Sequence, residues 1–238
     1  MRPQDLMAGH LRFSLLSADQ VSVFDNSPDK QPELVWPRAK GWITFVSGSI
    51  GRLAVRNLTY RRPNEEPVQI TALAAAAVWK NSSLSVSDLR LTSSFGVLEG
   101  SVLAGFHRPL LKAKLAATPA HPAAGVDSIR LDAAFGPGKK PGEMKGSLQI
   151  HGLQNTRPVL RISSDIGMTP AGLTFAKILL RRGNRPGSIA GEGFLAFKGP
   201  TPHAALKVQA ENMDLSDELK VPAKFNGSLL LDGTGRQY

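Results

Sequence analysis

The five histidines are the residues best able to bind a metal or transfer protons, and they are scattered along the chain. None stands in a His-x-His or His-Glu-x-x-His pattern, the spacings that bring two imidazoles to one metal ion. The chain has no cysteine, which excludes disulfides and thiolate metal sites. We therefore expect no metal site, and we interpret every histidine as a surface or loop residue: His10, His107, His121, His151 and His203.

Patterns that bind nucleotides or support hydrolysis are equally weak. The segment 191–196 matches G-x-G-x-x-A, but no helix is expected after it to receive a pyrophosphate. Gly138-Lys139 lacks the other residues of a phosphate-binding loop, and no Gly-x-Ser-x-Gly motif occurs. The clustered carboxylates fall in turns and are expected to be solvated: Glu65, Glu66, Asp214, Asp217 and Glu218. The sequence thus predicts no catalytic residues, no cofactor and no enzyme.

The basic residues are the other group with functional potential, because the formal net charge is +10 at pH 7. Such a charge permits binding to anionic lipid or to nucleic acid. Lys and Arg are nevertheless dispersed, mostly at strand ends and loops, where they keep sheet edges soluble. We favour that interpretation, place anionic membranes second and expect no nucleic acid partner. The short basic pairs are Arg61-Arg62, Lys139-Lys140 and Arg181-Arg182.

The elements that carry these residues are predicted to be short strands. Only 6% of the residues are aromatic, while 23 glycines and 17 prolines supply many turns. No apolar run reaches the length of about 18 residues that a membrane-spanning helix needs. The chain is therefore expected to be all-β.

The stretch 187–235 shows the strand pattern most clearly. Apolar residues alternate with polar ones through 204–211, through 221–226 and again around Leu230, a two-residue period typical of a half-buried sheet. Asn226-Gly227 is predicted to interrupt the ladder between the last two runs. A Gly-Ser-aliphatic tripeptide is predicted to open strands at an interval of roughly 40 to 50 residues, as in stacked repeats; it begins at Gly48, Gly100, Gly146, Gly187 and Gly227.

The same alternation predicts strands through the rest of the chain. The register slips between Val86 and Leu89, which predicts a β-bulge or tight turn near Asp88. Residues 74–77 and 172–182 are open to helix or strand. Val78, Trp79 and the short length of the run favour strand in the first, and the all-β context favours strand in the second. A Pro/Ala loop is expected over 118–125 and a break over 136–142. The remaining predicted strands lie near 11–16, 21–23, 42–46, 53–58, 68–73, 84–91, 95–106, 111–115, 129–133, 148–150 and 160–162.

Two phrases of the sequence resemble a known family. Val78-Trp79 followed by 84–106, LSVSDLRLTSSFGVLEGSVLAGF, and the segment 191–235 are similar to the translocation and assembly module subunit TamB family, which belongs with the AsmA-like, bridge-type lipid-transfer proteins. A Trp ahead of a strand and repeated Gly-x-Leu openings carry the resemblance. It covers residues 67–238 well and 1–66 loosely, so we expect a leading β-repeat region over 1–66 and a TamB-like region over 67–238.

The resemblance implies a fold, a place and partners. The fold would be an elongated, twisted β-sheet folded as a half-pipe with an apolar concave groove. The protein would stand in the periplasm and carry phospholipid between the inner and outer membranes, and it would support outer-membrane protein assembly, with an outer-membrane barrel protein of the Omp85 type as partner. The family's N-terminal inner-membrane anchor and C-terminal conserved region have no counterpart, so a fragment of a longer protein is expected.

An apolar face agrees with this function from the residue pattern alone, because a sheet that is apolar on one side must fold onto itself or hold something apolar. The alternative is a structural or adhesive β-solenoid with a closed core and no lipid. A third possibility is a platform that offers its sheet edge to incoming strands. The residues predicted to line the groove are Val102, Ala104, Phe106, Leu148, Ile150, Leu160, Ile162, Ala204, Leu206, Val208, Val221, Ala223, Phe225, Leu229 and Leu231.

Overall fold

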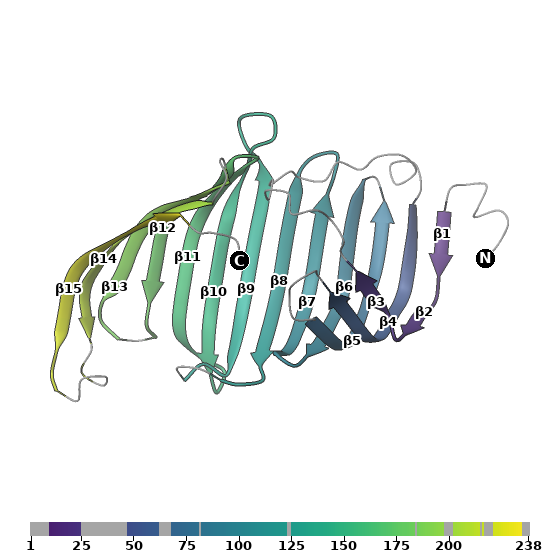
Figure 1. Cartoon of the computed structure of the whole chain (residues 1–238), viewed down its shortest axis with the longest axis horizontal. Helices are drawn as coiled ribbons and strands as arrows, with labels where there is room; N and C mark the ends of the chain where they lie inside the picture. The colour runs from purple at the N-terminus through teal and green to yellow at the C-terminus, as the bar shows by residue number, and fades with distance from the viewer. Residues whose placement is uncertain are drawn as a thin grey trace. The chain divides into compact units, whose positions relative to one another are not determined.

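A computed structural model describes most of the chain, and every element in it is a strand. The described residues are 10–24, 47–61, 68–80, 82–122, 125–183, 185–197, 202–214, 216 and 221–234. The chain divides into two compact units, with the described residues up to 122 in unit 1 and those from 125 onward in unit 2. In each unit the strands lie side by side in an open sheet (Figure 1). The predicted boundary near residue 66 and the predicted strand at 42–46 lie outside the described residues.

Unit 1 is built on the long strand β4. Three short strands pair with it in parallel, one after another along its length, and from β4 to β8 each strand is antiparallel to the next. The strands are β1 (His10–Phe13), β2 (Leu16–Asp19), β3 (Ser22–Phe24), β4 (Ser47–Arg61), β5 (Val68–Lys80), β6 (Ser83–Ser93), β7 (Gly96–Gly105) and β8 (Leu110–Pro119).

Unit 2 is an antiparallel meander in which each strand pairs with the next along the chain. Asn155 and Thr156 both have positive φ and join β10 to β11, the geometry that suits a tight hairpin between twisted strands. The strands are β9 (Ser128–Pro137), β10 (Met144–Gln154), β11 (Arg157–Thr169), β12 (Gly172–Arg181), β13 (Ser188–Ala196), β14 (His203–Asp214) and β15 (Lys224–Thr234).

The all-β prediction is confirmed, and both segments that were open to helix or strand are strands. Residues 74–77 lie in β5, and residues 172–181 form β12. The bulge predicted near Asp88 is confirmed, because the register of β6 against β7 shifts between Val86 and Leu89. Asp88 itself has φ of 51°. Open sheets of this kind are what the predicted half-pipe requires of each unit.

Several predicted strand limits are wrong. β15 begins at Lys224 and runs through Asn226-Gly227 without a break, so Val221 and Ala223 lie before the strand. The reason is a bulge on the neighbouring strand: the register shifts between Ala210 and Met213, and the Asn226 Oδ1 accepts a hydrogen bond of 2.7 Å from the Asn212 backbone N–H. The Asn226 side chain thus satisfies the Asn212 N–H that the bulge leaves unpaired, and β15 continues through Asn226-Gly227 where a turn was predicted.

The loops and the glycine repeats also differ from expectation. β8 continues to Pro119 and β9 to Pro137, so the predicted loop and break are shorter than expected. Gly100 and Gly227 lie inside strands and do not open them. Gly100 has φ of 149°, and a Cβ there would collide with the Lys114 carbonyl of β8. Its role is to let two backbones approach, which only glycine permits.

Candidate functional site

One face of unit 1 is apolar from strand to strand. Register pairing places directly opposed residues on the same face of a sheet. Val102 and Ala104, both predicted groove residues, each belong to an apolar row that crosses six strands. The first row is Ala113, Val102, Val86, Ala77, Ile50 and Phe13, and the second is Leu111, Ala104, Leu84, Trp79, Gly48 and Leu11. We call this surface the apolar face of unit 1.

Unit 2 has an apolar face of the same construction. One of its rows is Leu131, Ile150, Ile162, Leu180, Ile189, Ala210 and Gly227; another is Phe135, Gly146, Ile166, Phe175, Gly193, Leu206 and Leu231. Glycines at Gly146 and Gly193 leave room for the large neighbours Phe135 and Leu206. Ten predicted groove residues share this face: Leu148, Ile150, Leu160, Ile162, Ala204, Leu206, Val208, Phe225, Leu229 and Leu231.

Three predicted groove residues do not belong to these rows. Phe106 follows β7, at the start of the turn to β8, and its backbone N–H donates to the carbonyl of Ser82, just before β6. Val221 and Ala223 precede β15, and Val221 is 57% exposed. Alternation alone placed them in the set, because a two-residue period does not reveal where strand pairing begins.

The most buried side chains of the apolar faces were missed by the sequence interpretation. Met144 is 1% exposed, and Phe135, Ile166, Met213 and Ala113 are also buried. Phe135 continues the alternation 129, 131, 133, so its position was available in the sequence. Met144 was not, because it follows the glycine and proline residues of a turn and only its pairing with Met168 and Pro137 reveals its neighbours.

The apolar faces have no second layer within their units. Among the described residues of each unit, the substantial strand contacts are those between hydrogen-bonded neighbours. Most apolar side chains on these faces are therefore half-buried, and those on β15 are half-exposed: Phe225 50%, Leu229 52% and Leu231 51%. An uncovered apolar surface of this extent is typical of a binding surface.

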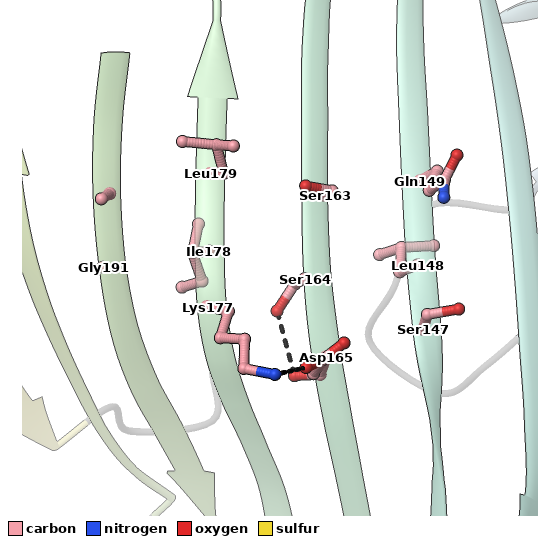
Figure 2. Close-up of a pocket in the computed structure, with 11 residues that line it drawn as sticks. Ser147, Leu148, Gln149, Ser163, Ser164, Asp165, Lys177, Ile178, Leu179 and Gly191 are labelled. Carbon is pink, nitrogen blue, oxygen red and sulfur yellow. Dashed lines mark hydrogen bonds and ion pairs between the residues drawn. The ribbon is translucent and has the colours of Figure 1, made fainter.

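The opposite face of unit 2 is polar and contains a hollow of 590 Å³ (Figure 2). We call it the polar hollow after the face on which it opens, although its lining is both polar and apolar and includes Leu148 of the apolar face. Strands β10 to β13 line it with Ser147, Leu148, Gln149, Ser163, Ser164, Asp165, Lys177, Ile178, Leu179, Ala190 and Gly191. The Lys177 Nζ lies 2.9 Å from the Asp165 Oδ2, and this contact raises the pKa of Lys177. Lys177 is the extra residue of a bulge in β12, with φ of 50°, which turns its side chain toward β11.

The other titratable groups with shifted pKa values serve turns. Backbone N–H groups at Lys140 and Lys139 and the Lys145 ammonium hold the pKa of Glu143 below 4.5. Ser216 donates from its hydroxyl and its backbone N–H and lowers the pKa of Asp214. These carboxylates close loops, an arrangement that differs from a pair of carboxylates facing one substrate.

The histidines do not gather. His203 is the best placed, since its Nε2 lies 2.7 Å from the Asp232 Oδ1 and its ring meets that of Phe194 edge-on. In the part of the chain that the structure describes, no group of three or more His, Asp or Glu side chains could hold a metal ion. The described residues also include no helix long and apolar enough to cross a bilayer.

Comparison with other proteins adds no identification. No family model, no curated protein and no solved structure matches the chain.

Proposed function

We propose that the apolar faces hold phospholipid acyl chains and that the chain is part of a bridge-like lipid carrier of the TamB type. Such a carrier would stand in the periplasm, anchored in the inner membrane. It would pass phospholipid toward the outer membrane and support assembly of outer-membrane proteins, with an Omp85-type barrel as partner. The observation that carries the proposal is the set of uninterrupted apolar rows across each unit.

The energetics favour an acyl chain as the guest. Each methylene moved from water onto an apolar surface contributes about 0.8 kcal/mol. The rows offer Leu, Ile, Val and Ala side chains beside glycines such as Gly146 and Gly193, which keep the surface open. Neither polar hydrogen-bonding groups nor charges interrupt the row through Ile150 and Ile162, so a hydrocarbon chain meets no desolvated donor along it.

The alternative, a β-solenoid with a closed core, requires one sheet to pack against another. Within each described unit the strands contact their hydrogen-bonded neighbours instead. Only eight hydrophobic residues of the described chain are buried, which is few for a closed core. The absence of a second sheet over the apolar face within each described unit therefore favours the lipid carrier over the closed solenoid.

The test is lipid co-purification read by native mass spectrometry. The chain would be purified from a bacterial periplasm, and its bound lipid compared with that of Leu206→Asp and Gln209→Asp. Leu206 lies on the apolar face and Gln209 on the polar face of the same strand, so the two variants add the same charge to opposite sides. We expect bound phospholipid to be lost only in Leu206→Asp, with the β circular-dichroism signal retained.

Two results would oppose the proposal. A wild-type chain that is folded and free of lipid would favour a closed structural role. Unfolding of Leu206→Asp, with Gln209→Asp intact, would mean that the apolar face is a core and not a binding surface.

A further inference from the structure

Four basic residues lie side by side on the polar face of unit 2. His151 of β10 is opposite Arg130 of β9 and Arg161 of β11, and Arg161 is opposite Arg181 of β12. Neighbouring strands lie about 4.8 Å apart, so this row spans roughly 15 Å. Neighbouring members of the row are 10 to 21 positions apart in the sequence, so the row is created by strand pairing and not by a run of basic residues. We call the four residues the basic row.

The basic row is not neutralised by nearby carboxylates. The closest in register are Asp132, beside Gln149, and Glu211, beyond Ser188. Among the described residues, neither carboxylate forms an ion pair with a member of the row. Arg130, Arg161 and Arg181 are exposed, and His151 is half-buried. Arg161 and Arg181 are like charges placed opposite one another, which opposes pairing of β11 with β12, so the row has a cost in stability that an anionic ligand would offset.

The polar hollow borders this row. Gln149 and Ser163 line the hollow and are the next residues on the same face after His151 and Arg161, about 7 Å along the strands. Leu179, which also lines it, holds the same position relative to Arg181. On the far side of the hollow the Lys177 ammonium is bound by Asp165 and adds no net charge. Positive charge thus lies along one side of a hollow whose lining is both polar and apolar.

We propose that the basic row and the polar hollow form a binding site for a phosphate group carried on a small polar body. The arginines would bind the phosphate oxygens, for which the guanidinium fork is well shaped. Gln149 and Ser163 would bond to the hydroxyl or ester groups of the body. The same chemistry is offered by a phospholipid headgroup and by a soluble phosphorylated polyol. The site lies on the face opposite the apolar rows and does not depend on lipid binding there.

The test measures binding of the whole chain to two probes. One is glycerophosphate in solution, followed by calorimetry, and the other is vesicles of equimolar phosphatidylglycerol and phosphatidylcholine, followed by co-sedimentation. The double variant Arg161→Gln with Arg181→Gln should bind at least about tenfold more weakly to whichever probe binds. Binding to glycerophosphate identifies a soluble source, and binding to vesicles alone identifies a lipid headgroup.

Lys139→Gln with Lys140→Gln removes the same charge from exposed residues in the turn between β9 and β10, where no basic row exists. It should bind as the wild type does. Equal losses in both double variants would mean attraction to net charge alone and would overturn the site. Absence of binding to both probes would overturn it as well.

A matched pair of glutamines tests the hollow. Gln149 and Gln209 lie in one cross-strand row on the polar face, but only Gln149 lines the hollow. Gln149→Leu should weaken binding several-fold while Gln209→Leu leaves it unchanged. Equal effects of the two substitutions, or no effect of either, would contradict placement of the ligand in the hollow.

Discussion

At the scale of the residue, three non-glycine positions in the left-handed region bend the strands. Asp88, Lys177 and Asn212 have φ of 51°, 50° and 49°, and each marks a register shift in its strand. The left-handed conformation costs an L-residue about 1–2 kcal/mol, less for Asp and Asn. Lys177 has no such tolerance. Its ion pair with Asp165 holds the bulge that borders the polar hollow.

Asn212 offers a test of this cost, because it is exposed and only its backbone N–H has a role, as donor to Asn226. Asn212→Val should lower the free energy of unfolding by about 1–2 kcal/mol, since a β-branched residue is disfavoured at positive φ. Asn212→Gly should match or exceed the wild type. Urea unfolding measures both. Equal stability of the Val and Gly variants would show that the bulge can relax.

Glu143 predicts a pH dependence. Its pKa in the folded chain lies below 4.5, chiefly because of the Lys140 backbone N–H. A carboxyl with a depressed pKa stabilises the fold above its unfolded pKa, and the stabilisation disappears as pH falls through the folded value. The melting temperature of the wild type should exceed that of Glu143→Gln at neutral pH, and the two should converge below pH 4.5. A difference that is constant with pH would contradict this.

At the scale of the element, glycines decide how closely strands approach. A Cβ at Gly146 would strike the Ala134 carbonyl and Phe135, whereas a Cβ at Gly136 meets nothing within 4 Å. Gly146→Ala should therefore destabilise the chain by about 1–3 kcal/mol, as overpacking does. Gly136→Ala should be neutral or stabilising by up to about 1 kcal/mol. Thermal or urea unfolding compares them, and equal effects would mean that the strands β9 and β10 can separate without cost.

The arginines of the basic row should repel one another across the strands. Because Arg161 is directly opposite Arg181, Arg161→Gln should raise the free energy of unfolding by about 0.2–1 kcal/mol at low salt. High salt should remove the gain by screening. Lys207→Gln, on the same face but opposite Glu192 and Leu230, should not stabilise. A gain in stability that accompanies weaker phosphate binding is the expected property of a residue kept for function.

The sequence predicted strands better than it predicted surfaces. Alternation identified β6, β10 and β14 and the bulge at Asp88, because each depends on residues close together in the chain, whereas β12 was assigned only from the all-β context. The ten predicted groove residues of unit 2 do share one face of its sheet, since the two-residue period that selected them is local. The basic row and the polar hollow depend on which residues of different strands stand opposite, and nothing local to Arg130 or Arg161 indicates that. The predicted break at Asn226-Gly227 was wrong because strand pairing again decides the outcome: the bulge that lets β15 continue lies on the neighbouring strand β14.

At the scale of the whole molecule, the strand β15 is the least protected part of the described sheet. Among the described strands it pairs only with β14; its apolar-face side chains Phe225, Leu229 and Leu231 are about half exposed, and Leu230 on the polar face is 69% exposed. Exposed apolar edge strands promote association between chains by continuing the ladder. Natural edges are usually protected by a charge, and here the nearest charged residues in the strand are Lys224 and Asp232.

We therefore expect the purified chain to self-associate through β15. Leu230→Lys should shift the mass measured by light scattering toward the monomer, at a cost of about 0.2–1 kcal/mol in stability because the added ammonium stands opposite Lys207. Thr174→Lys, an exposed position of the same face on the inner strand β12, is the control and should leave the mass unchanged. If association continues in Leu230→Lys but ceases in Leu206→Asp, the chains meet through the apolar face. Lipid and a second copy would then compete for the same surface, and added phospholipid should dissociate the assembly.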